Sequence, residues 1–284
     1  MDVSWNSCIK RHRENILDGR VKKMKTNYHT HNELCGHAGG TIEEYVKKAI
    51  ELEFDVLGMS DHLPFPGDAF GMRMKFEDLK TYADETKRLK KAYKNKLRIY
   101  LGGEAEYIPG YEKYYEQLLN KMGFDYLILG QHFYMNGMYY CANVYDDMKA
   151  TKDVMTYAKS AMQGMATGYF AYLAHPDLFF VNEFKIDRQL KKAVDYLLNE
   201  STKRNYILEW NANGLRRLTT SYPNAYFWEE VAKTNIPVII GADCHSVDNL
   251  YDWAMEISEK KAKEMGLHVI DHLEIKNKRT LVLL

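Results

Sequence analysis

The sequence predicts an α/β protein whose parallel strands close into a single (β/α) barrel. Strand-like and helix-like stretches alternate along most of the chain, which is typical of strands joined by helical crossovers. The strand-like stretches are mostly apolar and lack polar alternation, as expected for strands covered on both faces. Repeated about seven times, this pattern closes most simply as a barrel, and 284 residues suit one such domain.

The predicted strands follow one another along the whole chain. They are expected at 25–31, 55–62, 97–104, 125–133, 169–175, 206–211 and 237–245. The fourth, Asp125 to Phe133, reads DYLILGQHF and is almost continuously apolar, which favours a buried strand. An eighth strand is expected either at 268–273 or at 279–284. We therefore expect a distorted barrel of seven strands, with an eighth strand less well defined.

Helices are expected between these strands. Thr41 and Glu44 have the spacing of a capping box, which predicts a helix from this point to about Glu53. In a later segment Leu190, Val194, Leu197 and Leu198 recur at i, i+4, i+7 and i+8 and form one apolar stripe. Further helices are expected at 76–94, 111–121 and 151–166. Each of them would cover the outer face of the barrel.

The chain shows no linker, internal repeat or low-complexity segment, so we expect one domain at 25–284 after an N-terminal extension at 1–24. Basic residues exceed acidic ones in this extension, which we interpret as solvated; an arm that binds nucleic acid is the less favoured alternative. Lys and Arg together number 39, as do Asp and Glu. This balance gives no overall field toward nucleic acid, so we expect no nucleic-acid partner.

The cysteines and the apolar runs indicate a compartment. Four cysteines form no CxxC pair, and a disulfide framework is unexpected in a chain of this size. We therefore expect a cytoplasmic protein. The sequence has no apolar run approaching the ~18 residues of a membrane span and no signal-peptide core in its first residues. We expect no membrane partner.

The segment Asn27 to His37, NYHTHNELCGH, carries the first candidate metal ligands. His29 and His31 are two residues apart, so on a strand their imidazoles leave the same face. The turn at Gly36 would bring His37 back toward them. A His-x-His motif alone also fits two half-buried strand histidines, and short motifs often match by chance. The rest of the chain must decide between these readings.

Further candidate ligands occur where the other predicted strands end. The nine candidates are His29, His31, His37, His62, Glu104, His132, His175, Asp243 and His245. The carboxyl ends of parallel barrel strands meet on one face, where active sites of such barrels are found. His12, His268 and His272 are elsewhere and are assigned to the surface or to packing. Cys35 and Cys244 are read as buried thiols rather than ligands.

This ligand set exceeds the needs of one ion. A four-coordinate zinc ion takes three or four protein ligands, so nine candidates indicate two or three divalent ions. Zinc, manganese and iron all accept imidazole and carboxylate ligands. A carboxylate can bridge two ions and an imidazole cannot, so Glu104, in the middle of the barrel, is the candidate bridge.

These motifs resemble those of the polymerase and histidinol phosphatase (PHP) superfamily, and within it the histidinol-phosphate phosphatases. The resemblance runs from about Asn27 to Asp248. The matching motifs are HTHNELCGHA, SDHLPFP, GGEAEYI, DYLILGQHF, AHPDLF, EWNANGLR and GADCH. The resemblance implies a distorted seven-stranded barrel of the PHP type with three metal ions at the carboxyl ends of its strands.

The resemblance also implies how the ligands divide among the ions. His29, His31, Glu104 and Asp243 would hold the first ion. Glu104, His132 and His175 would hold the second, and His37, His62 and His245 the third. The implied activity is hydrolysis of L-histidinol phosphate to L-histidinol and phosphate, the penultimate activity of histidine biosynthesis. We hypothesise a hydroxide bridging the first two ions as the nucleophile, which requires no protein nucleophile.

The expected catalytic residues are Glu104, Asp243 and His245. A phosphate ester also calls for a fixed cation, and Arg216, beyond the sixth strand, is the first candidate for a bidentate contact. Arg73 is the second candidate, and Tyr107 or the pair at 139–140 could form a wall against an imidazole-bearing substrate. The expected partner is a small phosphorylated molecule.

Two other functions are weighed against this hypothesis. A PHP phosphoesterase could act on another small phosphate ester or on nucleotide ends, although the neutral charge disfavours nucleic acid. A non-catalytic metal-binding PHP module is the alternative outside enzymes, and the intact ligand set argues against it.

Overall fold

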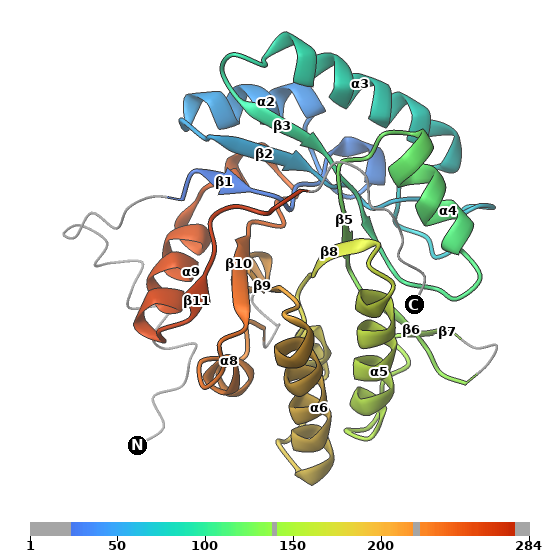
Figure 1. Ribbon diagram of the computed structural model, residues 1–284, viewed down its shortest axis with the longest axis vertical. Helices are drawn as coiled ribbons and strands as arrows, with labels where there is room; N and C mark the ends of the chain where they lie inside the picture. The colour runs from blue at the N-terminus through green and yellow to red at the C-terminus, as the bar shows by residue number, and fades with distance from the viewer. Residues whose placement is uncertain (1–23, 138–140, 218–221, 276–284) are drawn as a thin grey trace.

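The computed structural model describes residues 24–137, 141–217 and 222–275. Parallel strands lie at its centre and helices lie outside them (Figure 1). The expected N-terminal extension, except for its last residue, the possible strand at 279–284 and the tyrosine pair at 139–140 fall outside the described residues. Within the described part of the chain, no helix is both long enough and apolar enough to cross a membrane.

The strands form two parallel sheets and a small antiparallel pair. The first sheet has the order β1 (Thr26–Asn27), β2 (Val56–Met59) and β3 (Arg98–Leu101). The second has the order β11 (His268–Val269), β10 (Pro237–Gly241), β9 (Leu208–Asn211), β8 (Phe170–Leu173), β5 (Leu127–Leu129) and β4 (Glu104–Ala105). The antiparallel pair is β6 (Phe133–Met135) with β7 (Cys141–Asn143). The predicted α/β class with parallel strands is confirmed.

Two isolated bridges join the two sheets beyond the ends of β1 and β2. Thr30 pairs with Cys244, which follows β10, and His62 pairs with Glu104 in β4. The backbone amide of His31 donates to the carbonyl of Cys244 at 3.1 Å, so the carboxyl ends of β1 and β10 are held together. The bridges therefore bring the ends of strands from both sheets to one place.

The helices that the sequence predicted with bounds begin and end within a few residues of those positions. Their bounds are α2 (Ile42–Glu51), α3 (Leu79–Ala92), α4 (Glu112–Glu116), α5 (Asp153–Ala166), α6 (Arg188–Arg204), α7 (Asn213–Arg216), α8 (Ala225–Val231) and α9 (Trp253–Glu264). Short 3₁₀ turns occur at Glu33–Cys35, Phe76–Asp78, Leu178–Asn182 and Val247–Leu250, and a π-helical turn at Gln117–Lys121 continues α4. The capping box of Thr41 and Glu44 is present at the start of α2.

Alternate strand residues pack into two different clusters. Leu127 and Leu129 of β5 join the large cluster shared with the helices, whereas Ile128 joins a second cluster with Tyr28 and Tyr126. Because side chains alternate across a strand, the second cluster lies on the face of the strands away from those helices. The Tyr126 hydroxyl donates to the carbonyl of Tyr28 at 2.6 Å. This cluster therefore forms a second apolar layer on the other face of the strands.

Gly58 provides the room for this packing. A Cβ built on Gly58 would lie 2.1 Å from the hydroxyl oxygen of Tyr126, a distance that real side chains do not tolerate. The close approach requires glycine in a strand that is otherwise apolar.

Glu259 is an ionisable group buried in α9. It is 7% exposed, and its Oε1 accepts the backbone amide of Met24 at 3.0 Å. Burial raises the pKa of Glu259 to about 7. Between the ordinary pKa and this value the folded protein keeps a proton that the unfolded chain has released. The free energy of unfolding therefore falls as the pH rises through this interval.

We expect Glu259→Gln to stabilise the protein at pH 8 by about 1–3 kcal/mol and to have little effect at pH 5. The amide oxygen of Gln can still accept from Met24, while the buried charge is removed. Urea titrations at both pH values measure the difference. Glu229→Gln, at an exposed position of α8, controls for net charge. An equal effect of Glu259→Gln at both pH values would contradict the prediction.

Candidate metal centre

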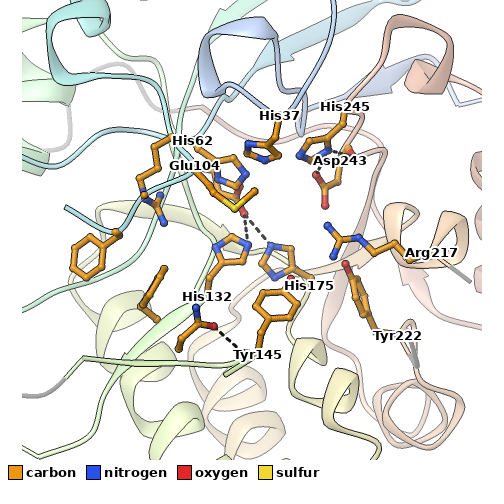
Figure 2. A pocket seen from close by; sticks show the side chains of 16 residues that line it. His37, His62, Glu104, His132, Tyr145, His175, Arg217, Tyr222, Asp243 and His245 are labelled. Carbon is orange, nitrogen blue, oxygen red and sulfur yellow. Dashed lines mark hydrogen bonds and ion pairs between the residues drawn. The ribbon is translucent and has the colours of Figure 1, made fainter. Parts of the chain in front are cut away.

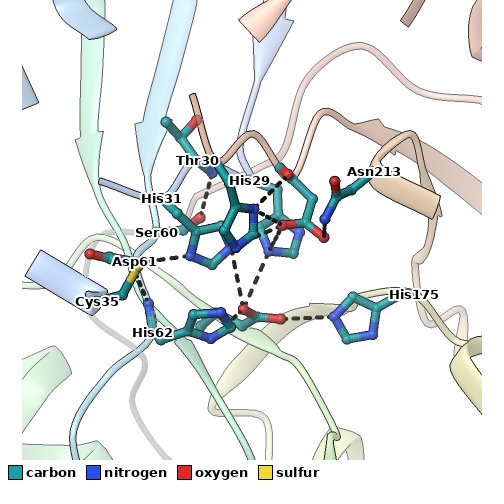
Figure 3. Close-up of polar contacts among 12 residues, drawn as sticks. His29, Thr30, His31, Cys35, Ser60, Asp61, His62, His175 and Asn213 are labelled. Atoms are coloured by element: carbon teal, nitrogen blue, oxygen red, sulfur yellow. Dashed lines mark hydrogen bonds and ion pairs between the residues drawn. The ribbon is translucent and has the colours of Figure 1, made fainter. Parts of the chain in front are cut away.

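The structure brings all nine predicted ligands to the carboxyl ends of the strands (Figure 2 and Figure 3). They reach this place from β1, β2, β4, β5, β8 and β10, and from the turn after Glu33–Cys35. The centroid of the His31 ring lies 4.2 Å from that of His62 and 4.3 Å from that of His245. The rings of His132 and His175 are 4.8 Å apart. Side chains distant in sequence therefore meet in one cluster.

The Glu104 carboxylate lies at the centre of this cluster and is 1% exposed. Its Oε2 is 2.9 Å from Nδ1 of His62, 3.4 Å from Nε2 of His29 and 3.5 Å from Nε2 of His31. Its Oε1 is 2.9 Å from Nε2 of His175 and 3.9 Å from Nε2 of His132. One carboxylate thus faces imidazoles from both sides, as a bridging ligand would.

Asp243 is the second carboxylate of the cluster. Its Oδ1 is 3.0 Å from Nε2 of His31, and its Oδ2 accepts from the side-chain amides of Asn211 at 3.0 Å and Asn213 at 3.3 Å. Burial opposes ionisation of Asp243 and Glu104, but the surrounding imidazoles outweigh it and hold the pKa of each well below its usual range. Both side chains are therefore anionic.

Unpaired polar atoms test whether this cluster fits metal ions. Within the described residues, Nε2 of His29, Nε2 of His31, Oε2 of Glu104 and Oδ1 of Asp243 are buried, and none of them makes a hydrogen bond of acceptable geometry despite the short distances between them. Leaving such atoms unpaired is costly, and native proteins avoid it. A divalent cation among these atoms would satisfy them together. Imidazole nitrogens and carboxylate oxygens are ligands for zinc, manganese and iron.

The protonation of the imidazoles supports this fit. Burial lowers the pKa of His245 to about 3, and burial likewise lowers the pKa of His37 and His62, so these three rings are neutral and can offer a lone pair. Burial also acts to lower the pKa of His31, but Asp243 and Asp61 outweigh it and raise this pKa to about 9. A bound cation would take the place of the proton on His31.

Three buried carboxylates behind the ligands were not predicted from the sequence. Asp61 Oδ1 is 3.1 Å from Nδ1 of His31, Glu106 Oε1 is 3.1 Å from Nδ1 of His132, and Glu209 Oε1 is 2.7 Å from Nδ1 of His29. A carboxylate at this nitrogen fixes the tautomer and the ring direction of a metal-binding histidine. The signal in the sequence was a charged residue inside or just after an apolar strand, as in SDH, GGEAE and LEWN.

The two buried cysteines near the cluster agree with their reading as thiols. Burial raises the pKa of both Cys35 and Cys244 to about 12. The Cys35 sulfur lies close to His31 and Asp61, but its thiol donates to the carbonyl of Asn32 at 3.1 Å. Both thiols are therefore protonated.

The cluster forms the floor of a cavity of about 280 Å³ (Figure 2). Phe70, Met72 and Phe133 supply apolar lining, and the polar lining outside the cluster comes from Arg73, Asn143, Tyr145, Arg217 and Tyr222. The Arg217 guanidinium points into the cavity between Asp243 and Tyr222. The lining combines apolar walls with two cationic side chains.

Arg216, the first sequence candidate for a phosphate contact, is not at this cavity. Its Nε and Nη2 donate to the carboxylate of Asp252 at 2.8 and 2.9 Å, and its Nη1 donates to the carbonyl of Ala242 at 2.6 Å. Arg216 ends α7, and the extended backbone of the next residue turns Arg217 to the other side. The prediction was one residue away from the arginine that lines the cavity.

Of the other two candidates for substrate binding, Arg73 lines the cavity and Tyr107 does not. Arg73 lines the cavity, but its Nη2 is 2.6 Å from Glu106 Oε1, and its guanidinium lies within about 6 Å of three phenylalanine rings. The hydroxyl of Tyr107 donates to Glu112 at 3.1 Å, and Tyr107 does not line the cavity. Arg73 therefore neutralises the carboxylate behind His132.

Comparisons with known proteins identify the family of this chain. A family model of the PHP domain matches residues 27–213. A Deinococcus radiodurans protein named as a probable histidinol-phosphatase is 29% identical over 227 residues, which cover 76% of this chain and 85% of that protein. The histidinol-phosphatase of Bacillus subtilis is 24% identical over 257 residues, which cover 80% of this chain and 96% of that protein.

Solved structures share the fold. A histidinol phosphate phosphatase from Lactococcus lactis, solved with zinc, L-histidinol and phosphate, aligns with a TM-score of 0.69 and 17% identity over 91% of this chain and 100% of that chain. A structure from Listeria monocytogenes aligns with a TM-score of 0.68 and 23% identity over 81% of this chain and 98% of that chain. The family match covers well over half of the sequence, and the chain belongs to the PHP domain family.

Proposed function

We propose that this protein is a metal-dependent phosphomonoesterase that hydrolyses L-histidinol phosphate to L-histidinol and phosphate. The observation that carries the proposal is the set of buried, unpaired imidazole and carboxylate atoms on the floor of a cavity that an arginine enters from the side. The names of the relatives from Deinococcus radiodurans and Bacillus subtilis supply the substrate. The Lactococcus lactis structure that shares this fold holds L-histidinol and phosphate together.

The nine ligands would hold two or three divalent ions of zinc, manganese or iron. Their ligand atoms fall into groups that include His29, His31 and Glu104; His31, His62 and His245; and His62, Glu104 and His132. Such ions supply a nucleophilic water at neutral pH and neutralise the charge of a phosphate dianion. Glu104 would contribute to more than one of these groups, in keeping with a bridging role.

The residues of the cavity have distinct roles in this proposal. Arg217 would bind the phosphoryl oxygens from the side opposite the imidazoles of His37 and His62. Asp243, Glu104 and His245 would act in catalysis by holding the divalent ions at the floor of the cavity. Phe70 and Phe133 would pack against the non-reacting part of the substrate and exclude water from it.

The remaining parts of the proposal concern the architecture and the setting. We treat the two sheets as one distorted barrel, because the Thr30–Cys244 and His62–Glu104 bridges join them. Its seven strands are β1, β2, β3 with β4, β5, β8, β9 and β10, and β11 is the eighth strand expected at 268–273. One apolar cluster includes residues from Met24 to Ala262, which supports a single domain at 25–284. A cavity of about 280 Å³ suits a small phosphorylated partner. A cytoplasmic setting fits the three buried or half-buried free thiols.

A two-substrate assay tests the proposed function. Purified protein is supplied with zinc or manganese, and phosphate release from L-histidinol phosphate is compared with release from an aryl phosphate. We expect kcat/KM for L-histidinol phosphate to exceed that for the aryl phosphate by at least about 100-fold, since specific contacts to a substrate add several kcal/mol. Treatment with a chelator should abolish both activities. Equal turnover of both substrates would indicate a broad phosphoesterase, and no turnover would indicate a binding module.

A further inference from the structure

Glu209 is a buried carboxylate of β9 that is not among the nine ligands. It is 0% exposed, and its Oε1 lies 2.7 Å from Nδ1 of His29. Its Oε2 accepts the backbone amide of His175 at 3.1 Å and the side-chain amide of Asn211 at 2.8 Å. Both carboxylate oxygens of Glu209 are therefore already in contact with other groups of the protein.

The network continues from Glu209 to a third ligand. The same Asn211 side-chain nitrogen donates to Oδ2 of Asp243 at 3.0 Å. Through direct contacts and one amide, Glu209 is thus connected to His29, His175 and Asp243, which follow three different strands, β1, β8 and β10. One side chain therefore contacts, directly or through Asn211, three candidate ligands that come from three different strands.

Two of these ligands have a backbone conformation that residues other than glycine rarely adopt. The φ angle is +29° at His175 and +43° at Asp243. Such conformations cost on the order of 1–3 kcal/mol and persist where surrounding contacts fix them. Glu209 binds the backbone amide of His175, and Asn211 binds the carboxylate of Asp243. The network therefore acts at both strained positions.

Gly241 on the neighbouring strand β10 makes room for this carboxylate. A Cβ built on Gly241 would lie 1.9 Å from Oε1 of Glu209, well inside contact distance. Any larger residue at this position would have to displace the Glu209 side chain from His29. Glu209 and Gly241 thus lie on paired strands, and the glycine leaves the space that the Glu209 carboxylate occupies.

We propose that Glu209 is the positioning residue of the metal centre, which sets the direction of His29, His175 and Asp243 without binding a metal itself. A carboxylate oxygen at Nδ1 of His29 leaves Nε2 as the metal-binding atom and increases the basicity of the ring. The proposal rests on the metal centre of the proposed function, but it does not depend on which phosphate ester is the substrate.

Glu209→Gln tests this role, because it conserves the size of the side chain. A Gln amide has one acceptor oxygen, so it cannot accept from both His29 on one side and His175 and Asn211 on the other. We expect affinity for zinc, measured by competition with a chromophoric chelator, to fall by about 10–100-fold. The visible spectrum of the cobalt(II)-loaded protein should also change. Far-UV circular dichroism verifies that the variant is folded.

Gly241→Ala gives an independent perturbation, since it leaves the chemistry of Glu209 unchanged and displaces its carboxylate. We expect the same loss of zinc affinity. The double variant should bind zinc as tightly as the single variant with the lower affinity, because both substitutions act on one contact. If Gly241→Ala does not fold, Asn211→Ala replaces it and should affect the centre through Asp243. Glu259→Gln, a buried carboxylate remote from the centre, is the matched control and should retain zinc.

A folded Glu209→Gln variant with normal zinc affinity and an unchanged cobalt spectrum would overturn the proposal, as would additive losses in the double variant. Zinc binding is measured without substrate, so failure of the positioning role and failure of the proposed activity give different results. A protein that binds zinc in a Glu209-dependent manner but does not hydrolyse L-histidinol phosphate would contradict only the proposed activity.

Discussion

Glu104→Gln is expected to lower kcat/KM for L-histidinol phosphate by about 10³-fold or more while the fold persists. The loss of several kcal/mol reflects the removal of the negative charge at the centre of the cluster. Glu104 presents one oxygen to His29, His31 and His62 and the other to His132 and His175. The single carbonyl oxygen of a Gln side chain cannot bridge cations on both sides.

The size of the replacement matters at this position. A Cβ built on Gly130 would lie 2.0 Å from Oε1 of Glu104. The space next to Gly130 therefore fits the Glu104 side chain closely. Gln conserves that shape. Phosphate release and metal content should be measured together with a thermal melt. Glu53→Gln, whose side chain is 82% exposed, provides the control for the same chemical change. Near-normal turnover of a folded Glu104→Gln variant would remove Glu104 from the proposed mechanism.

The sequence was sufficient to predict which nine side chains meet in the cluster, because their positions follow a simple rule. His62 and His175 come just after apolar strands, Glu104 ends the predicted strand at 97–104, and parallel strands end on the same face. Short strands did not obscure the pattern, since β1 and β4 contain two residues each and still fall within or at the edge of the predicted stretches. The positions of these side chains depend on the strands running parallel, which the alternation of strands and helices already indicates.

Contacts that depend on side-chain direction were harder to predict. Arg216 and Arg217 are adjacent, and the choice between them depends on where α7 ends, which sequence patterns define only to within one or two residues. Asp61, Glu106 and Glu209 lie behind the ligands, so their role requires knowing which ring nitrogen faces inward. Gly130 and Gly241 could have served as signals, because each leaves space for a carboxylate on an adjacent strand.

Arg217→Ala is expected to lower kcat/KM for L-histidinol phosphate by about 10²–10³-fold, with metal content unchanged. Its guanidinium enters the cavity beside Asp243, where it can donate two parallel hydrogen bonds to phosphoryl oxygens. Removing a comparable fixed donor from an enzyme site costs this much. Arg217→Lys should recover part of the loss, because it restores the charge without the planar fork. Inhibition by inorganic phosphate should weaken in parallel.

The adjacent residue gives a matched comparison with the opposite outcome. Arg216 is paired with Asp252 at 2.8 Å and donates to the carbonyls of Ala242 and Asn249, so Arg216→Ala leaves a largely buried carboxylate without its cation. We expect it to lower the free energy of unfolding by about 3 kcal/mol and to change kcat/KM less than Arg217→Ala does, provided that the folded protein is assayed. Urea titration and steady-state kinetics on both variants separate the two roles. A large loss of kcat/KM in a stable Arg216→Ala variant, with Arg217→Ala active, would return the phosphate contact to Arg216.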